Sequence, residues 1–238
     1  MSKYLKQQNY LRILTMDKTI LITGTTSGLG FELAQFYVEK DWNVIGLSRN
    51  PSKINSKNYQ HYTVDIGNYN LLKETFIKIN STIDMLVNNA AIFEMKSFNE
   101  TTIEQIDRLI DTNLKGSIYV TKLALNLMKC DSRIFFINSV AGINELENQS
   151  IYCSTKHGLT GFAGVLGKEL QNRNIKVTSI HPGGINTPLW NEDNQYPCGD
   201  VSNAISPKEI ANLIDFIYNS KSNIEYKTIK MFPDKEWH

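Results

Sequence analysis

Tyr152 and Lys156 are the residues of this sequence whose types and spacing best suit proton transfer. Side chains at i and i+4 share one face of a helix, so the lysine ammonium can lie near the phenol. A free tyrosine has a pKa of about 10, and a nearby cation favours the phenolate and lowers that pKa. Because this pair also occurs by chance in many helices, the prediction of a general acid depends on the residues that accompany it.

Three glycines, Gly24, Gly28 and Gly30, lie between a predicted strand and a predicted helix. A tight turn needs glycine, and a helix N-terminus offers free amides and a positive dipole to a pyrophosphate. The spacing is Gly-x-x-x-Gly-x-Gly, which differs from the common Gly-x-Gly-x-x-Gly fingerprint. The position of the turn predicts a dinucleotide site.

The end of the second predicted strand reads Ser48-Arg49-Asn50. NAD sites usually carry a carboxylate there for the ribose 2′-hydroxyl, whereas an arginine suits a 2′-phosphate. The segment has no acid, so the sequence favours NADP(H). The alternative is that Arg49 is a solvated residue in a turn before Pro51.

The elements that must position these residues alternate between strands and helices. Apolar runs predict strands at 19–23, 43–47, 62–64, 83–87, 133–137, 176–180 and 225–231. Helical spacing predicts helices at 31–40, 71–79, 102–111, 114–128, 150–171 and 207–218. This alternation predicts an α/β, Rossmann-like doubly wound parallel sheet of about seven strands with helices on both faces. We expect residues 1–15 to be a dispensable or alternatively initiated extension and residues 16–238 to form one domain.

Composition excludes several other classes of protein. The net charge of +1 leaves no surplus for nucleic acid or anionic lipid, and the longest apolar runs fall short of the roughly 20 residues that span a membrane. Cys130, Cys153 and Cys198 are too few and too scattered for a disulfide framework or a zinc site. We therefore expect no metal, a reducing cytoplasmic location, and a packing role for Cys153.

Six motifs occur in an order that resembles the short-chain dehydrogenase/reductase family in its compact, single-domain form. They are Thr23-Gly24-Thr25-Thr26-Ser27-Gly28-Leu29-Gly30, Asp65, Leu86-Val87-Asn88-Asn89-Ala90-Ala91, Asn113, Ser139 with Tyr152-Cys153-Ser154-Thr155-Lys156, and His181-Pro182-Gly183-Gly184-Ile185-Asn186-Thr187-Pro188. Ala91 departs from the pattern, which has glycine there, and narrows the room beside the cofactor. The resemblance covers about residues 18–218.

The resemblance implies a catalytic group of Asn113, Ser139, Tyr152 and Lys156. Ser139 and Tyr152 would hold the substrate oxygen, and Lys156 would also donate to the nicotinamide ribose. Asn113 would interrupt a helix and hold a water that relays protons from Lys156 to solvent, although an ordinary capping asparagine is the alternative. His181 is interpreted as a strand-end residue, since the tyrosine already fills the acid/base role.

The resemblance also implies where the cofactor lies. Ile185 backbone and the Thr187 hydroxyl would clamp the carboxamide, Asp65 would contact the adenine or cap a helix, and Asn88 would be structural. The expected contacts are Gly24, Thr26, Ser27, Gly28, Leu29, Gly30, Ser48, Arg49, Asn50, Asp65, Ile66, Asn89, Ala90, Ala91, Tyr152, Lys156, Pro182, Gly183, Ile185 and Thr187.

The expected function is NADP(H)-dependent hydride transfer between the nicotinamide and a carbonyl or secondary alcohol. A catalytically silent NADP(H)-binding regulator would lack the serine, tyrosine or lysine, and a sugar-nucleotide epimerase would need a larger C-terminal region. The positions expected to line the substrate site mix apolar and polar groups, so the substrate stays open. They are Ile92, Phe93, Glu94, Ile143, Asn144, Leu189, Trp190 and 191–201.

We also expect a homodimer built on the helices at 114–128 and 150–171, because the second is apolar on more than one face. Many members of the family form tetramers through a Gly-Gly turn near the C-terminus. Residues 229–238 contain no glycine, which argues against that tetramer.

Overall fold

Seven short strands form a single parallel sheet in the computed structural model, which describes residues 18–190, 196–197 and 199–234. The strands are β1 (Thr19–Thr23), β2 (Asn43–Ser48), β3 (Tyr59–Thr63), β4 (Ile83–Asn88), β5 (Met128–Ile137), β6 (Lys176–Pro182) and β7 (Thr228–Met231). Their order across the sheet is β3-β2-β1-β4-β5-β6-β7, and all neighbours run parallel. The predicted Rossmann-like sheet is confirmed. The extension at 1–15, most of the 191–201 loop and Cys198 lie outside the described residues.

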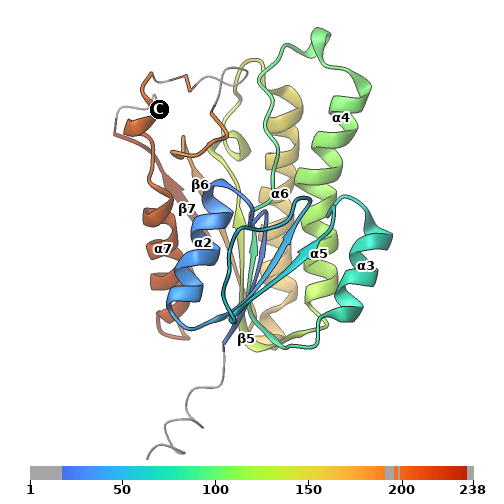
Figure 1. The fold of residues 1–238 in the computed structure, drawn as a ribbon. Coiled ribbons are helices and arrows are strands. Elements are labelled where there is room, and N and C mark those ends of the chain that lie inside the picture. Colours follow the sequence, from blue (N-terminus) through green and yellow to red (C-terminus); the bar gives the residue numbers. More distant parts are fainter. Residues whose placement is uncertain (1–17, 191–195, 198, 235–238) are drawn as a thin grey trace, which may run out of the picture.

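Helices cover both faces of this sheet (Figure 1). One face is covered by α2 (Gly28–Glu39) and α7 (Pro207–Asn219), and the other by α3 (Tyr69–Lys78), α5 (Ser117–Ala124) and α6 (Ser150–Glu169). None of the helices within the described ranges combines the length and the hydropathy needed to cross a membrane.

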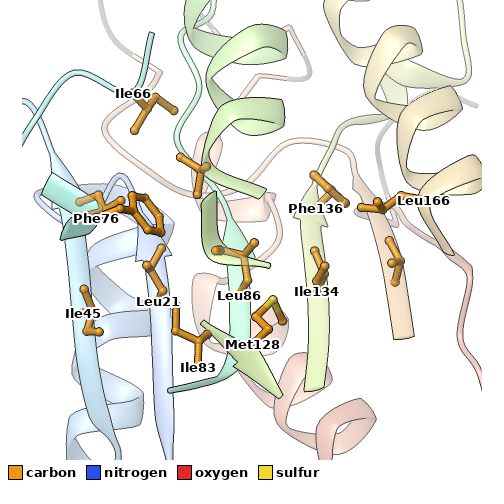
Figure 2. Close-up of a cluster of buried hydrophobic side chains, with 14 of the residues drawn as sticks. Leu21, Ile45, Ile66, Phe76, Ile83, Leu86, Met128, Ile134, Phe136 and Leu166 are labelled. Atoms are coloured by element: carbon orange, nitrogen blue, oxygen red, sulfur yellow. The ribbon is translucent and has the colours of Figure 1, made fainter. Parts of the chain in front are cut away.

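The two faces have separate cores because successive strand side chains point in opposite directions. In β1, Leu21 packs toward α3, α5 and α6, whereas Ile20 and Ile22 pack toward α2 and α7. All three are fully buried, which explains why the sequence shows a continuous apolar run. Figure 2 shows the first core, where Phe76 and Leu166 approach the strands from the helices. Burial of each such side chain contributes about 1.5–3 kcal/mol.

Several segments differ from the sequence prediction. Strand β5 begins at Met128, where the prediction began at 133, and β7 begins at Thr228, where the prediction began at 225. Strand β3 begins at Tyr59 and ends at Thr63, earlier than the predicted 62–64, because its polar, half-exposed residues belong to a sheet edge. The helices predicted at 102–111 and 114–128 form one continuous path instead. Here α4 (Ile103–Leu109) passes through a π-helical segment (Ile110–Gly116) into α5.

From β1 the chain adds β2 and β3 on one side of the sheet, and from β4 onward it adds strands on the other side. The strand order therefore reverses between β1 and β4. In parallel α/β sheets a crevice opens at this switch point, beyond the carboxyl ends of the strands. The segments that follow β1, β2, β4, β5 and β6 all meet there, and they contain most of the residues singled out above.

Candidate active site

A cavity of about 450 Å³ lies at the carboxyl edge of the sheet. It is lined by Ser139, Tyr152 and Lys156 and by nearly all of the predicted cofactor contacts. These are Gly24, Thr26, Ser27, Gly28, Leu29, Ser48, Arg49, Asn50, Asp65, Ile66, Asn89, Ala90, Ala91, Pro182, Gly183, Ile185 and Thr187. Gly30 and Asn113 do not line the cavity, but each contacts a residue that does.

The glycine-rich turn after β1 is held in a shape that side chains would prevent. Gly24 and Gly28 adopt φ values of +78° and +53°. A Cβ on Gly30 would lie 2.1 Å from the Gly24 carbonyl oxygen, so Gly30 permits the turn to pack on α2 and does not touch the cavity. The N-cap Ser27 makes no side-chain cap bond, which leaves the first amides of α2 facing this turn. The cradle fits an anionic group such as a pyrophosphate.

The turn after β2 carries one buried and two exposed residues. Arg49 and Asn50 are exposed, whereas Ser48 is buried and its hydroxyl accepts a 2.7 Å hydrogen bond from the Thr25 amide. This hydroxyl therefore joins the two turns, and because Ser48 also lines the cavity, its contact with a nucleotide stays a prediction. Arg49 remains available to an anion at this end of the cavity.

A chain of hydrogen bonds supports this turn from below. The Thr25 hydroxyl lies 2.8 Å from the Tyr59 hydroxyl, which lies 3.0 Å from Nδ1 of His61. Nε2 of His61 lies 2.9 Å from the Asn50 carbonyl oxygen. Sequence reasoning missed this chain, although the two-residue spacing of Tyr59 and His61 places them on one face of β3 and could have indicated it.

Asp65 lies beyond β3 and lines the cavity. Its Oδ1 accepts from the Gly67 amide at 2.9 Å, whereas the N-cap of α3 is Asn68, which accepts from the Leu71 amide. The predicted capping role of Asp65 is therefore wrong, and the carboxylate instead fixes a turn at the rim.

The segment after β4 is tied to the glycine-rich turn. The Thr23 hydroxyl accepts from the amides of Asn89 and Ala90 at 3.0 and 2.9 Å, and the Asn89 side chain donates to the Thr23 carbonyl. Asn88 is buried and donates to the Thr121 hydroxyl, as expected of a structural residue. Ala91 lines the cavity without a strained φ angle.

Ser139, Tyr152 and Lys156 converge at the other end of the cavity. Ser139 follows β5, and the two other residues share the inner face of α6, where the Lys156 Nζ lies 5.6 Å from the centroid of the Tyr152 ring. The ammonium donates to the Ile137 carbonyl at 3.1 Å. The spacing therefore brings the three side chains together, as predicted.

The electrostatics of this group differ from the expectation. Burial raises the pKa of Tyr152 to about 12, while a hydrogen bond with Ser139 acts in the opposite direction. Burial also lowers the pKa of Lys156 to about 8. The prediction that Lys156 lowers the tyrosine pKa is not met by these side chains alone, because desolvation penalises both charged forms.

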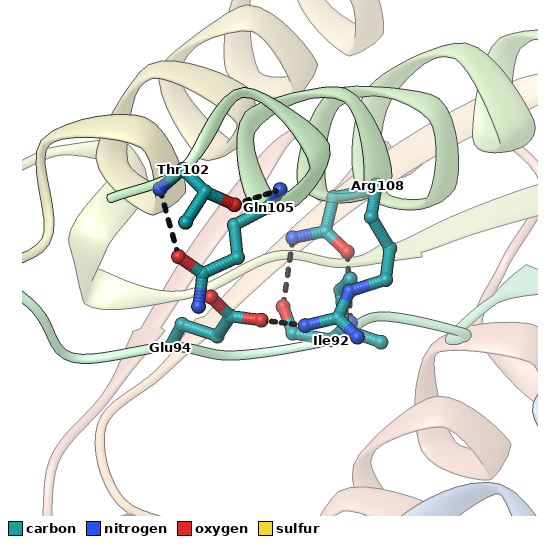
Figure 3. A network of polar contacts seen from close by, with 6 residues as sticks. Ile92, Glu94, Thr102, Gln105 and Arg108 are labelled. Atoms are coloured by element: carbon teal, nitrogen blue, oxygen red, sulfur yellow. Dashed lines mark hydrogen bonds and ion pairs between the residues drawn. The ribbon is translucent and has the colours of Figure 1, made fainter. Parts of the chain in front are cut away.

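Asn113 lies in the π-helical segment, which is the helix interruption predicted for it. Its Oδ1 accepts from the Ile92 amide and its Nδ2 donates to the Ile92 carbonyl, both at 2.8 Å. Figure 3 shows this neighbourhood, with Ile92 beneath α4 and the ion pair of Glu94 and Arg108 beside it. Ile92 occupies one acceptor position and one donor of this side chain, and the main-chain carbonyl of Asn113 is a further acceptor for a water.

His181 is fully buried at the end of β6. Its Nδ1 lies 3.0 Å from the Ser139 carbonyl oxygen and its Nε2 lies 2.9 Å from the Ser179 hydroxyl. Burial lowers the pKa of the imidazole. With both nitrogens occupied, the ring supports the backbone of Ser139 and is not placed as a base.

The loop after β6 closes the cavity over the glycine-rich turn. A Cβ on Gly28 would lie 3.3 Å from Cβ of Thr187, which brings segments more than 150 residues apart into contact. The Ile185 carbonyl accepts from the indole of Trp190 at 2.9 Å. The Ile185 backbone is one of the groups predicted to hold the carboxamide.

The positions predicted to line a substrate site divide into two groups. Ile92, Phe93, Leu189 and Trp190 line the cavity, whereas Glu94, Ile143 and Asn144 do not. Pro197, from the predicted 191–201 loop, also lines the cavity. Sequence reasoning missed several other lining residues, among them Thr112, Val140, Leu146 and Gln149.

Comparison with known proteins identifies the family. The family described as short chain dehydrogenase matches residues 18–197, so this chain is a member of the short-chain dehydrogenase/reductase family and an oxidoreductase. It is similar to an uncharacterized oxidoreductase of Schizosaccharomyces pombe, with 32% identity over 74% of this chain and 63% of that protein. It is also similar to carbonyl reductase family member 4 of Xenopus laevis, with 30% identity over 86% of this chain and 92% of that protein.

Solved structures share the fold. 4-Hydroxyisoleucine dehydrogenase complexed with NADH superposes with a TM-score of 0.82 at 24% identity, over 91% of this chain and 97% of that one. ElxO with NADP bound superposes with a TM-score of 0.79 at 24% identity, over 92% of this chain and 98% of that one. One of these structures holds NADH and the other NADP. The shared fold therefore leaves the choice of nucleotide to local residues.

Proposed function

We propose that the protein is an NADP(H)-dependent oxidoreductase that interconverts a carbonyl and an alcohol, with Tyr152 as its general acid and base. The observation that carries the proposal is the convergence of Ser139, Tyr152 and Lys156 in one cavity with the glycine-rich turn and Arg49. A catalytically silent regulator would lack one or more of these three residues, and this chain has all of them.

In the direction of reduction, Ser139 and Tyr152 hydrogen-bond the substrate oxygen and stabilise its developing negative charge. Bound NADPH supplies the hydride that adds to the carbonyl carbon. Tyr152 gives its proton to the oxygen, which yields the alcohol. The ammonium of Lys156 then stabilises the resulting phenolate by its charge.

The chain also suggests how the proton returns to Tyr152. Lys156 is buried and is bonded to the Ile137 carbonyl, so it has no direct route to solvent. A water on the Asn113 main-chain carbonyl would complete the path. The Ser117 hydroxyl donates to the same carbonyl at 3.1 Å.

Arg49 supports the choice of NADP(H). Arg49 is exposed at the end of the cavity where the adenosine would lie. Among the described residues that line the cavity, the cations are Arg49 and Lys156, and they lie at opposite ends. A guanidinium beside a 2′-phosphate forms charge-assisted hydrogen bonds. The free thiol of Cys130 is exposed, which supports a reducing, cytoplasmic setting.

The test is a panel of aldehydes and ketones with NADPH or NADH, followed by the loss of reduced-nicotinamide absorbance. Turnover with a clear preference for NADPH supports the proposal. Binding of NADPH without turnover of any carbonyl compound in the panel would favour the regulatory alternative.

We further propose a homodimer formed by the outer faces of α5 and α6. Val165 on α6 is 54% exposed, and Gly161 and Gly164 leave open space around their Cα atoms, so this face is smooth enough for close helix packing. Light scattering at micromolar concentration should give twice the chain mass of 27.1 kDa. A monomer there would contradict the proposal.

A further inference from the structure

Aromatic rings form a row that begins at the catalytic tyrosine. The Phe93 ring meets Tyr152 edge-on at 4.9 Å between centroids and meets Trp190 at 5.5 Å. Trp190 in turn lies 5.1 Å from Tyr196. Since Phe93, Tyr152 and Trp190 line the cavity, this row forms one wall beside the atoms that would react.

Several contacts fix the row in place. The indole of Trp190 donates to the Ile185 carbonyl at 2.9 Å. Tyr196 packs directly on Gly184, where an added Cβ would lie 2.2 Å from its Cε2. Phe93 is 8% exposed and follows Ile92, whose backbone is held by Asn113. The wall is therefore preformed, which favours a ligand of matching shape.

The described residues of this wall carry no charge that could pair with an ionic substrate. Glu94 was the acidic residue predicted to line the substrate site. It pairs instead with Arg108 of α4 (Figure 3). It lines a separate cavity of about 10 Å³. Among the described residues that line the main cavity, the charged side chains are Arg49, Asp65 and Lys156. The first two lie at the adenosine end, and Lys156 lies against the Ile137 carbonyl beneath Tyr152.

The neighbouring lining residues are mainly apolar, namely Ile92, Val140, Leu146 and Leu189, with Gln149 as an uncharged polar exception. A carboxylate or phosphate placed here would lose its hydration without gaining a charged partner among the described residues. A flat ring, in contrast, would find the edges and faces of aromatic side chains, which pair favourably at these distances.

We propose that the substrate is an uncharged carbonyl compound that carries an aromatic ring next to its carbonyl, with the ring packed against Phe93 and Trp190. The proposal rests on the proposed function, because it assigns a substrate class to the same site. The described residues of this wall offer no charge that would pair with a charged acyl carrier, a sugar phosphate or a keto acid.

The first experiment compares kcat/KM with NADPH for three aldehydes of similar size. 4-Methylbenzaldehyde should exceed 4-carboxybenzaldehyde by about tenfold or more, because the carboxylate is desolvated without a partner. It should exceed 4-methylcyclohexanecarbaldehyde by about three- to tenfold, the range expected of aromatic pairs. Equal values for the methyl and carboxyl compounds would overturn the proposal, and so would equal values for the aromatic and saturated rings.

Variants connect that preference to the wall. Phe93→Leu and Trp190→Leu should each reduce the preference for the aromatic over the saturated ring, whereas Trp190→Phe should retain it because a ring remains. Phe98→Leu is the matched control, since Phe98 is 62% exposed and does not line the cavity. A preference unchanged in both leucine variants would overturn the assignment of this wall.

A binding measurement separates this proposal from the proposed function. Calorimetry on the protein saturated with NADP⁺ should show tighter binding of 4-methylbenzyl alcohol than of 4-carboxybenzyl alcohol. This result together with no turnover would support the aromatic wall and overturn the proposed function. Turnover of aldehydes with equal binding of the two alcohols would overturn the aromatic wall and leave the function standing.

Discussion

At the catalytic end of the cavity, Ser139, Tyr152 and Lys156 are held by buried contacts from β5, α6 and β6, whereas at the adenosine end Arg49 and Asn50 are exposed on a single turn. The first arrangement sets geometry and pKa values before any ligand binds. The second leaves a cation exposed to solvent. The difference suggests that substitutions at one end change turnover, and those at the other change affinity.

The largest expected effect is that of Tyr152→Phe. The ring would keep its edge-on contact with Phe93, so the fold and NADPH binding should be retained, but the proton donor is lost. We expect kcat to fall by about a thousandfold, within the range of general acid catalysis. Rate and nucleotide affinity should be measured together, with Tyr62→Phe as a control because Tyr62 donates to the Lys78 carbonyl outside the cavity. Near-normal turnover would refute the assignment.

Lys156→Met should separate activity from stability. The pKa of Lys156 falls from 10.5 to about 8 through burial, which corresponds to a cost of about 3 kcal/mol for the charged form. That cost is present in full below pH 8 and fades as the pH rises toward 10.5, where the unfolded lysine is also neutral. The variant should therefore be inactive, yet more stable than the native protein at pH 7.

Urea unfolding at pH 7 and pH 10 measures this change. The loss of the hydrogen bond to Ile137 subtracts about 1 kcal/mol from the gain, so a net increase of about 2 kcal/mol is expected at pH 7. The gain should shrink or vanish at pH 10. A variant less stable than the native protein at pH 7 would show that the ammonium is better compensated than its burial implies.

The smallest effect is expected at the exposed end. Arg49→Ala should weaken NADPH binding by about tenfold and leave NADH binding nearly unchanged, because NADH lacks the 2′-phosphate. Lys53→Ala is a matched control, as Lys53 is an exposed cation nearby that does not line the cavity. Equal losses for both nucleotides would mean that Arg49 is only a solvated turn residue.

The predictable features of this chain were those encoded by local spacing. Buried strand runs such as 19–23 gave the sheet, and the four-residue spacing of Tyr152 and Lys156 gave their common helix face. The glycine pattern likewise placed the turn at the carboxyl end of β1. In each case the signal depends on neighbours within a few residues, which a sequence displays directly.

The remaining features depend on partners distant in the sequence. Glu94 forms an ion pair with Arg108, and the hydroxyl of Ser48 accepts a hydrogen bond from the Thr25 amide. The pKa of Tyr152 depends on how deeply several elements bury it, which no spacing reveals. A half-exposed edge strand such as β3 lacks the apolar run that marks a central strand, so its start was missed.

The hydrogen-bond chain beneath the Asn50 turn has a direction. The Asn50 carbonyl can only accept, so Nε2 of His61 carries the proton and Nδ1 accepts from the Tyr59 hydroxyl. Tyr59 must then accept from Thr25, and every hydroxyl in the series points toward β3. A single imidazole tautomer on the sheet edge thus orients the dipoles of a series of hydroxyls that reaches the glycine-rich turn.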